Sequence, residues 1–356
     1  MKTERVKILE MLEKGEITAD EASMLLSALE GKYNQQAYEN NNKNNQFIDF
    51  TKIINKITNT TQVLAKKTSK IYGNLEKEVK NIIKSSSNFN NKNNLCKEFN
   101  FVLNEMDNNL ELKSLNGEMV LKGYNGDKLT LNVLYIPKNI NNTIDFYNTE
   151  NKKFIFDFKE ENFDKVSLEV LVPKKYFKNI SLKAINSNFS LDGVYFENVF
   201  CETTKCNGII ENSEGKNISI NNINGKIIVR NIKANYLKIC NINNYVKLNN
   251  VDVENMSIDV LNGEIDVIND YLNLFDIYNW NIETQNNPIN VEINTDNVNY
   301  NLNAKTSLGK VTVLKNNLIY SEKSDYNVVA KTEHNNNLFK SLNLTLQTTN
   351  STIILS

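Results

Sequence analysis

The stretch LNGEIDV at residues 261–267 decides the fold, because the chain repeats its shape many times. A turn dipeptide, Asn262-Gly263, is followed by apolar residues at alternate positions, which is typical of a β-strand with one buried face. The same phrase occurs as INGKIIV at 223–229 and as LNGEMVL at 115–121. A turn followed by a short alternating strand is therefore a recurring unit of this chain.

The most regular copies lie in residues 180–270. Five of them, aligned on their turns, carry the turn Asn at positions 186, 207, 224, 243 and 262, so that the steps are 21, 17, 19 and 19. A second short alternating run lies between successive turns. A period near 19 with two strands per period predicts a mainly β fold, a right-handed β-solenoid or β-helix-like domain over residues 99–356, in which the less regular residues 99–175 could form a sheet that caps the solenoid. The alternative is an antiparallel sandwich, in which Asn-Gly forms hairpin turns. In a solenoid, stacked corner Asn side chains would bond to one another.

Residues 1–33 show helical rather than alternating periodicity. Gly15 is placed to end a first helix, and Thr18 with Glu21 forms a capping box that starts a second one. We expect a hairpin of two short helices, which buries little area by itself and therefore leans on a protein partner or on a second copy. Its interaction surface would include three apolar residues: Ile17, Leu25 and Leu26.

Two polar, Asn-rich linkers at 34–46 and 85–98 flank a long amphipathic segment at 47–84. Apolar residues recur there at spacings of three and four, which predicts a helix. Residues 46–85 hold eight Lys against three acidic residues, so their net charge is 8 − 3 = +5. The helix either packs on its own protein, lies on an anionic membrane surface, or self-associates. The candidate contact residues are Phe47, Phe50, Ile54, Ile57, Lys66, Lys67 and Lys70.

Bulk composition excludes several classes of protein. The 356 residues carry 41 basic and 42 acidic side chains, a net charge of −1 that argues against nucleic acid as a partner. The N-terminus lacks the apolar core of a signal peptide, and no stretch is apolar enough to span a bilayer. We therefore expect a cytoplasmic protein, peripheral at most to the inner face of the membrane. The four cysteines have no framework spacing and are expected to be reduced thiols.

Residues with catalytic or metal-binding potential are few. The single histidine, His334, cannot build a multi-histidine metal site, and neither a phosphate-binding loop nor a serine elbow is present. Glu264 and Asp266 could pair as glycosidase acids, although alternate strand positions also mark the outward face of a strand. Aromatic residues near Trp280 interrupt the repeat, either to cover the core or to form a contact patch. We expect no enzyme activity, no cofactor and no metal.

The order of these segments resembles that of the bacterial LiaX/YvlB-like proteins. The resemblance rests on KGEITADEASMLLSAL near the N-terminus, on VLVPKKYFKNISLKAINSNFSL at the entry to the repeats, and on the repeated turns. It implies a SHOCT-like helical hairpin joined to a β-solenoid of the putative-adhesin type, a domain of unknown function. It also implies a non-enzymatic binding or scaffold role in a cell-envelope stress response, exerted by protein or membrane contact. The alternatives are a carbohydrate-active solenoid enzyme and a surface adhesin.

Overall fold

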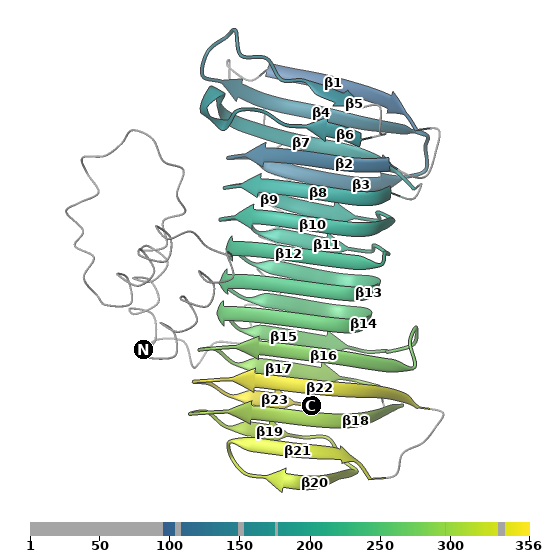
Figure 1. Ribbon diagram of the computed structural model, residues 1–356, viewed down its shortest axis with the longest axis vertical. Coiled ribbons are helices and arrows are strands. Elements are labelled where there is room, and N and C mark those ends of the chain that lie inside the picture. Colours follow the sequence, from purple (N-terminus) through teal and green to yellow (C-terminus); the bar gives the residue numbers. More distant parts are fainter. Residues whose placement is uncertain (1–94, 104–107, 149–152, 175–176, 296, 334–338) are drawn as a thin grey trace, which may run out of the picture. The chain divides into compact units, whose positions relative to one another are not determined.

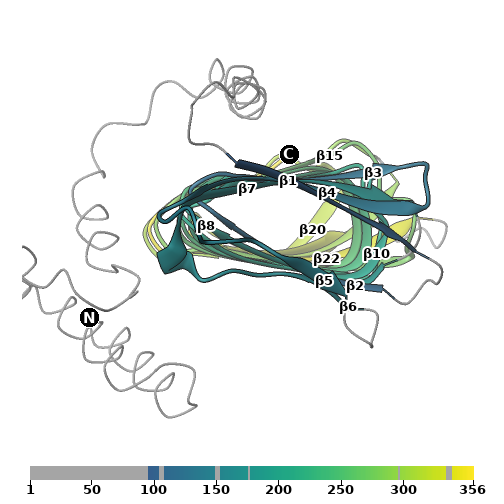
Figure 2. The ribbon, with the colours of Figure 1, turned by 90° about the horizontal axis from the view of Figure 1, so that it is seen from above.

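The computed structural model describes residues 95–103, 108–148, 153–174, 177–295, 297–333 and 339–356. Within these ranges the chain is mainly β-strand, with one short 3-10 turn at Glu160–Asn162 and no α-helix. Most strands are parallel and stack along one long axis (Figure 1). Seen along that axis, they form two facing walls around a flattened interior (Figure 2).

The first wall is a ladder of parallel strands, which we call the first ladder. Its strands, in spatial order, are β2 (Asn108–Leu115), β8 (Phe177–Ile185), β10 (Phe196–Thr204), β12 (Asn217–Asn224), the second half of β13 (Ile227–Asn243), the second half of β14 (Val246–Asn262), β16 (Ile277–Thr284), β22 (Lys340–Thr348) and β18 (Val298–Thr306).

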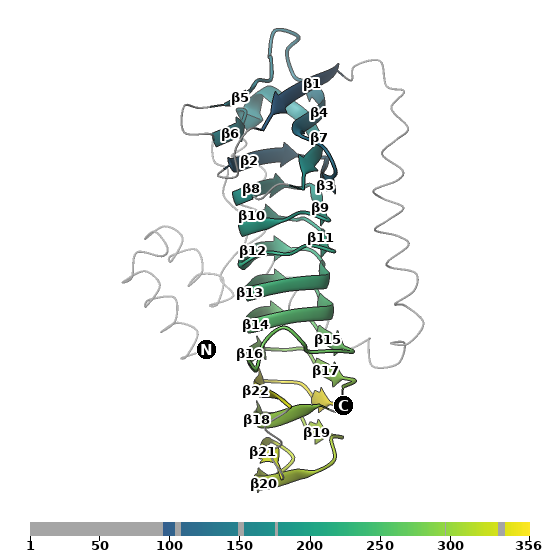
Figure 3. The same cartoon turned by 90° about the vertical axis from the view of Figure 1, so that its right-hand side faces the viewer.

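The opposite wall, the second ladder, holds the shorter strands that follow each turn. In spatial order they are β3 (Glu118–Tyr124), β9 (Asn188–Asp192), β11 (Gly208–Glu211), the first halves of β13 and β14, β15 (Ile265–Asn269), β17 (Ile289–Ile293), β23 (Ile353–Leu355) and β19 (Val311–Val313). The two ladders are seen edge-on in Figure 3.

Each coil contributes apolar side chains to the interior at the same positions as its neighbours. Ile227 pairs with Val246, and Val246 pairs with Ile265, so equivalent residues recur at one constant step along the sequence. All three side chains are fully buried, which confirms the sequence prediction that they occupy equivalent positions in one core. Since alternate residues of a strand point to opposite faces, this register places every second residue inside and leaves the rest on the outer faces.

The corners explain why the turns are rich in Asn and Gly. Gly193, Asn212, Asn231 and Asn250 occupy the same corner of successive coils, with φ values of 67°, 51°, 50° and 52°. Asn is one of the few residues that enters this left-handed region readily, because its short side chain bonds locally. A Cβ on Gly263 would lie 1.9 Å from the carbonyl oxygen of Asn244 on the preceding coil, so this corner requires Gly.

One predicted repeat was aligned wrongly. The sequence phrase CNGIIEN places Asn207 in the turn column, but the structure places Lys205 between Asn186 and Asn224, and the steps between coils then become equal. Gly208 instead lies inside β11, opposite Phe189. The absence of a side chain there makes room for the Phe189 ring, which a Cβ would meet at 2.1 Å.

Both ends of the stack depart from a simple coil. Strands β22 and β23 come last in the chain but insert between β16/β17 and β18/β19. Near the N-terminal end, β2 and β3 pair directly with β8 and β9, and the intervening chain places one parallel strand on the other side of β2 and another on the other side of β3. That chain forms the strands β4 (Lys128–Pro137), β5 (Phe146–Asn148), β6 (Lys153–Phe156) and β7 (Phe163–Pro173).

Antiparallel strands close the two ends. At one end β1 (Leu95–Val102) pairs with β4, and β4 pairs with β7. At the other, β20 (Leu318–Lys323) pairs with β21 (Asn327–Thr332), and β21 pairs with β18. Edge-to-face aromatic rings, with centroids 5.0 to 5.8 Å apart, fill the first end at Phe99, Phe101, Phe146 and Phe154. These ends protect strand edges that would otherwise pair with other chains.

The predicted fold class was therefore wrong as a whole. A right-handed β-solenoid running through 99–356 and carrying an N-terminal helical hairpin and a linker helix does not describe this chain: strand order is broken at both ends, antiparallel strands close them, and the described residues hold no α-helix. The hairpin at 1–33 and the helix at 47–84 lie outside the described residues. A local repeat predicts which residues occupy equivalent positions, but it does not predict which coils lie next to each other in the stack.

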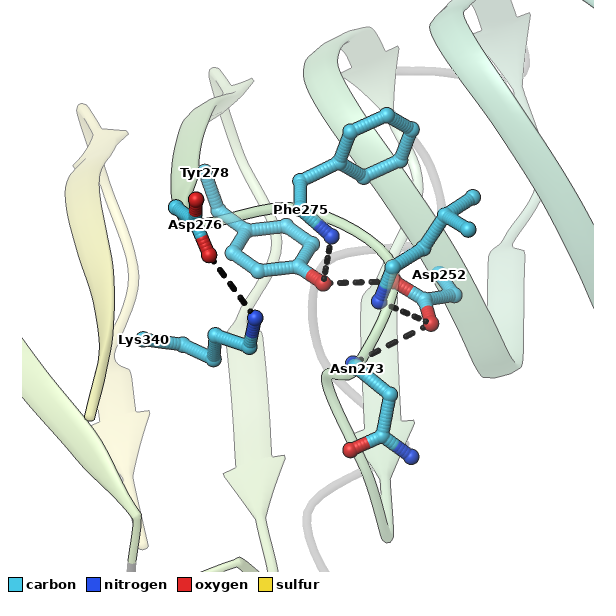
Figure 4. Close-up of polar contacts among 7 residues, drawn as sticks. Asp252, Asn273, Phe275, Asp276, Tyr278 and Lys340 are labelled. Carbon is cyan, nitrogen blue, oxygen red and sulfur yellow. Dashed lines mark hydrogen bonds and ion pairs between the residues drawn. The ribbon is translucent and has the colours of Figure 1, made fainter. Parts of the chain in front are cut away.

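An insertion marks the coil next to β22. Met256 pairs with Trp280, a longer step in sequence than the one from Leu237 to Met256, and the extra chain forms a loop ahead of β16. The loop is held by the buried carboxylate of Asp252, which accepts hydrogen bonds from the backbone N–H groups of Asn273 (3.1 Å) and Leu274 (3.0 Å) and from the Tyr278 hydroxyl (2.6 Å) (Figure 4). Tyr278 and Trp280 are themselves buried, so the aromatic residues near Trp280 cover the core.

Candidate binding face

The outer surface of the first ladder carries a column of asparagines, which we call the first asparagine column. Six side-chain amides each donate to the amide oxygen of the Asn on the preceding strand of the ladder, at 2.6 to 3.2 Å. Such bonds stabilise the stack, since they tie neighbouring coils by their side chains as well as by their backbones. Its members are Asn109, Asn179, Asn198, Asn217, Asn255, Asn279, Asn343 and Asn301.

A second column follows the corner at the end of the first ladder, and we call it the corner asparagine column. It confirms the prediction that stacked corner Asn side chains bond to one another, at 2.6 to 3.3 Å. Lys205, with φ 57°, occupies the position that separates its two parts. The Asn members are Asn116, Asn186, Asn224, Asn243, Asn262, Asn286 and Asn350.

Tyr236 interrupts the first asparagine column. It stands between Asn217 and Asn255 in the register, and its side chain is 56% exposed. Among the described residues no side-chain hydrogen bond of the column crosses it, so the column falls into two segments. An exposed aromatic ring placed where the other coils carry a stabilising Asn is a local departure of the kind expected at functional sites.

Phe200 is a second exception on the same face. It is 45% exposed and lies in the next outward column, where the other coils of the ladder carry polar residues: Glu111, Ser181, Ser219, Lys238, Ser257, Asn281, Thr345 and Asn303. Phe200 lies two strands from Tyr236 and two positions further along the strand. Strand geometry then separates their Cα atoms by about 10 Å across the ladder and about 7 Å along it. We call these two residues, with Asn217 and Ser219 between them, the aromatic patch.

The charges around the aromatic patch balance. Lys183 and Glu202 pair in the register of β8 and β10, and Lys238 lies in β13 two residues after Tyr236. Asp259 follows in β14, two positions beyond the partner of Lys238. These two positive and two negative side chains cancel, and Lys216, which precedes Asn217, forms an ion pair with Glu197, so the surroundings of the aromatic patch are polar and close to neutral.

The acid pair that the sequence proposes lies on the other wall. Glu264 and Asp266 both accept from the amide nitrogen of Asn290, at 3.0 and 2.8 Å, so the two carboxylates converge on one group. Burial raises the pKa of Glu264, with a further contribution from the charge of Asp266. One shared amide on the outer face of the second ladder holds both carboxylates, because its two N–H groups donate one hydrogen bond to each of them.

An open cavity of about 350 Å³ lies at the C-terminal end of the stack, far in sequence from Glu264. It is formed where the β20–β21 hairpin diverges from β19. The ammonium group of Lys323 lies 4.1 Å from the Tyr320 ring centroid, and that of Lys310 lies 3.5 Å from the carboxylate of Asp325. The charged groups lining this cavity are thus already engaged, Lys310 with Asp325 and Lys323 with the Tyr320 ring.

The candidate residues taken from the sequence are not placed by the structure. The membrane or partner contacts Phe47, Phe50, Ile54, Ile57, Lys66, Lys67 and Lys70 and the hairpin surface Ile17, Leu25 and Leu26 lie outside the described residues, as does His334. Sequence reasoning missed Tyr236 and Phe200. The sequence does contain the signal, an aromatic residue at a position that is polar in the other coils. It becomes visible only when the register of the repeat is known and equivalent positions can be compared.

Two kinds of feature are absent from the described residues. They hold no group of three His, Cys, Asp or Glu side chains arranged to ligate a metal. Nor does this part of the chain contain a helix long and apolar enough to cross a bilayer. The described cysteines form no disulfide: Cys96 is exposed, Cys240 is half-buried, and Cys201 and Cys206 are buried.

Comparison with solved structures gives neighbours of low sequence identity. The "putative adhesin" of Bacteroides fragilis is 11% identical, with 75% of this chain and 98% of that chain covered and a TM-score of 0.42. The "putative adhesin" of Parabacteroides distasonis is 9% identical, with coverage of 74% and 97% and a TM-score of 0.40. A "putative cell adhesion protein" of Clostridium sporogenes is 11% identical, with coverage of 73% and 99% and a TM-score of 0.28.

Family models give a firmer assignment. No protein of curated function matches the chain. A SHOCT-like domain matches residues 3–33, the segment in which the sequence predicts a helical hairpin. The model of the Toastrack DUF4097 family matches residues 101–340, which span both ladders and reach into both ends of the stack. Because that match covers most of the chain, the protein belongs to the Toastrack DUF4097 family.

Proposed function

We propose that this protein is a non-catalytic binding protein of the adhesin type, which holds an extended partner on the outer face of its first ladder. The observation that carries the proposal is the aromatic patch. Exposed Tyr236 and Phe200 replace the polar residues that the other coils place in their columns. A rigid, regular strand face with a few exposed aromatic residues suits binding, since the rings supply contact area with little loss of side-chain entropy.

The shape of the first ladder favours a long, extended partner over a compact one. The strands of the first ladder repeat at about 4.8 Å, and their outward side chains form straight columns. A flat face of this kind offers the same contacts along its length, as extended binding surfaces of repeat proteins do. The carbohydrate-active enzyme that we considered from the sequence is not favoured by any specific observation, because Glu264 and Asp266 lie on the wall opposite the aromatic patch.

The test is cosedimentation of the full chain with isolated bacterial cell envelopes. Ser219→Arg would place a long charged side chain in the middle of the aromatic patch without touching the core. Ser190→Arg is the matched control, because Ser190 lies on the outer face of the second ladder. We expect the wild-type protein and Ser190→Arg to sediment with envelopes and Ser219→Arg to remain in solution. Equal sedimentation of both variants, or none for the wild type, would refute the proposal.

Residues 1–94 support separate proposals that rest on sequence alone. The hairpin surface at Ile17, Leu25 and Leu26 would bind a protein partner or a second copy, and the basic segment at 47–84 would contact an anionic membrane at the inner face of the envelope. The test is flotation of the full chain with anionic vesicles, compared with the triple change Lys66→Glu, Lys67→Glu and Lys70→Glu. Loss of flotation at low salt supports membrane contact; unchanged flotation rejects it.

Cell location is part of the same proposal. An adhesin-type role needs the first ladder to reach a surface, whereas the sequence predicts a cytoplasmic protein. Protease treatment of intact cells, followed by detection of the full chain, separates the two. The role in a cell-envelope stress response that the resemblance implies stays a prediction.

A further inference from the structure

We propose that the aromatic patch binds a neutral polysaccharide, with one sugar ring stacked on Tyr236 and another on Phe200. This inference rests on the proposed function, because it names the partner of the same face. It is carried by two observations: the exposed rings of Tyr236 and Phe200 in two different columns, and the amide groups of Asn217 and Asn255 that Tyr236 leaves without Asn partners between them.

The rings provide the apolar part of the site. One face of a pyranose ring presents C–H groups, which pack against the π-face of a Tyr or Phe side chain. Tyr236 and Phe200 are 56% and 45% exposed on a flat ladder, so a sugar ring can lie on either one. Their separation of about 10 Å across the strands and about 7 Å along them suits neighbouring units of one chain rather than a single small molecule.

The interrupted asparagine column provides the polar part. Asn217 donates its amide N–H to Asn198, but its own amide oxygen receives no side-chain donor from the described residues, because Tyr236 stands where the next Asn would be. On the other side, Asn255 accepts from Asn279, and its amide nitrogen has no Asn acceptor on the Tyr236 side. Tyr236 is thus flanked by an available acceptor and by available donors, each about 4.8 Å away along the ladder.

Sugar hydroxyl groups match this arrangement, since each hydroxyl both donates and accepts. A sugar ring on Tyr236 would donate one hydroxyl proton to the Asn217 amide oxygen and accept from the Asn255 amide nitrogen. It would thereby restore the hydrogen bonds that Tyr236 removes from the column. The Ser219 hydroxyl, between the two rings, offers one more contact of the same kind.

Charge favours a neutral ligand over a nucleic acid. Single-stranded nucleic acids also stack on aromatic side chains, but they need a groove of net positive charge. Lys183 and Lys238 near the aromatic patch are balanced by Glu202 and Asp259. A phosphate backbone would gain little from this surface, whereas a neutral glycan needs no charge at all.

The experiment uses the full chain in native affinity electrophoresis through gels that contain a neutral polysaccharide: a β-glucan, an α-glucan, a mannan or soluble chitin. The variants are Tyr236→Ala, Phe200→Ala and Tyr236→Asn. Tyr326→Ala is the matched control, because Tyr326 is 55% exposed but lies in the end hairpin, away from the aromatic patch. Single-stranded DNA and anionic vesicles serve as competing probes.

We expect retardation by at least one of the neutral polysaccharides, weakened at least tenfold by each change at Tyr236 and Phe200, unaffected by Tyr326→Ala, and insensitive to salt. We expect Tyr236→Asn to stay folded, because it completes the asparagine column; urea denaturation of the same variant checks that its loss of binding is not a loss of structure. Absence of retardation by all four polysaccharides, retardation that Tyr236→Ala leaves unchanged, or binding only to DNA or vesicles would overturn the inference. Envelope binding that is lost in Ser219→Arg but persists against excess soluble glycan would also overturn this inference. It would leave the proposed function intact.

Discussion

The hydroxyl group of Tyr278 donates a 2.6 Å hydrogen bond to the buried carboxylate of Asp252, which lies on the preceding coil. The same hydroxyl oxygen accepts from the backbone N–H of Phe275 at 3.1 Å. This pair fastens the inserted loop ahead of β16 to that coil. Tyr278→Phe keeps the ring in the core but leaves one carboxylate oxygen and one backbone N–H without that partner. We expect a loss of about 1–3 kcal/mol in the free energy of unfolding, measured by urea denaturation.

Asp252→Asn and Tyr326→Phe complete that test. The first keeps the size of the side chain but weakens the bonds from Asn273 and Leu274, so it should destabilise as well. The second removes a hydroxyl from an exposed tyrosine and should change nothing. If Tyr278→Phe were as stable as the wild-type protein, the loop would not be held by this contact.

The same tyrosine gives a pH dependence. Burial raises the pKa of Tyr278 above its ordinary value of 10.0, and its hydrogen bond to Asp252 raises that pKa further. When the pH rises past 10, the unfolded state therefore releases this proton and the folded state keeps it. The unfolded state then binds fewer protons, so stability falls as the pH rises. The contribution is fully present below pH 10.

Unfolding free energies measured from neutral pH to about pH 11 should thus fall less steeply for Tyr278→Phe than for the wild-type protein, because Phe has no proton to release. The other tyrosines titrate in both proteins and cancel in the comparison. Parallel curves for the two proteins would mean that Tyr278 ionises as freely in the folded state as in the unfolded one.

Thiol reactivity should follow burial. Burial raises the pKa of Cys201 to about 12 and that of Cys206 to about 11, and Cys206 also donates to the backbone oxygens of Ala184 and Thr204. Because the thiolate is the reactive form, neither side chain should be alkylated in the native protein. Cys96 is exposed and should react first, with half-buried Cys240 slower. Mass spectrometry after timed iodoacetamide treatment measures this order, and urea should abolish it.

The core register can be tested at Ile265, which is fully buried between Val246 and Ile289. Ile265→Val removes one methylene group and should cost about 0.5–1.5 kcal/mol. Ile265→Asp places an unpaired charge in the stack and should prevent cooperative folding, as judged by thermal denaturation. Wild-type melting of the Asp variant would contradict the inward position of this column.

The sequence predicted the columns better than it predicted the chain path. Alternation and period were enough to place Ile227, Val246 and Ile265 in register, because each strand must bury one face. They were not enough to exclude Asn207 from the turn column, since Asn207-Gly208 has the same local chemistry as a real corner. The insertion of β22 between β16 and β18 was not predictable for the same reason: all coils present nearly identical edges, and only the whole stack decides which of them meet.

The aromatic patch, in contrast, could not be recognised from the sequence. Tyr236 in ANYLKIC and Phe200 in NVFCETT look like ordinary strand residues, because aromatic side chains favour strands and many of them are buried there. They stand out only when Asn217 and Ser219 are seen to occupy the same columns. Placing Asn207 in the turn column shifts the register on both sides of that coil, and the shift is enough to hide the comparison.

Tyr236→Asn separates stability from function. An Asn at 236 would donate to Asn217 and accept from Asn255, so that the two segments of the first asparagine column become one. Two added bonds between partly exposed amides should raise the free energy of unfolding by about 1–2 kcal/mol. The side chain that is lost is 56% exposed, so less than half of a tyrosine's surface is given up, and Tyr236→Ala measures what that loss costs by itself. Urea denaturation, with Tyr236→Ala as the variant that removes the ring without adding an amide, measures the gain.

A more stable Tyr236→Asn protein would mean that the natural chain keeps Tyr236 at the expense of stability. Proteins tolerate such costs at sites that serve a function, where a local departure from the best-packed arrangement is offset by binding. If Tyr236→Asn were instead less stable than both the wild-type protein and Tyr236→Ala, the ring would be a structural part of the stack. The two halves of the column would then be separated for reasons of packing, and the aromatic patch would lose its main support as a binding site.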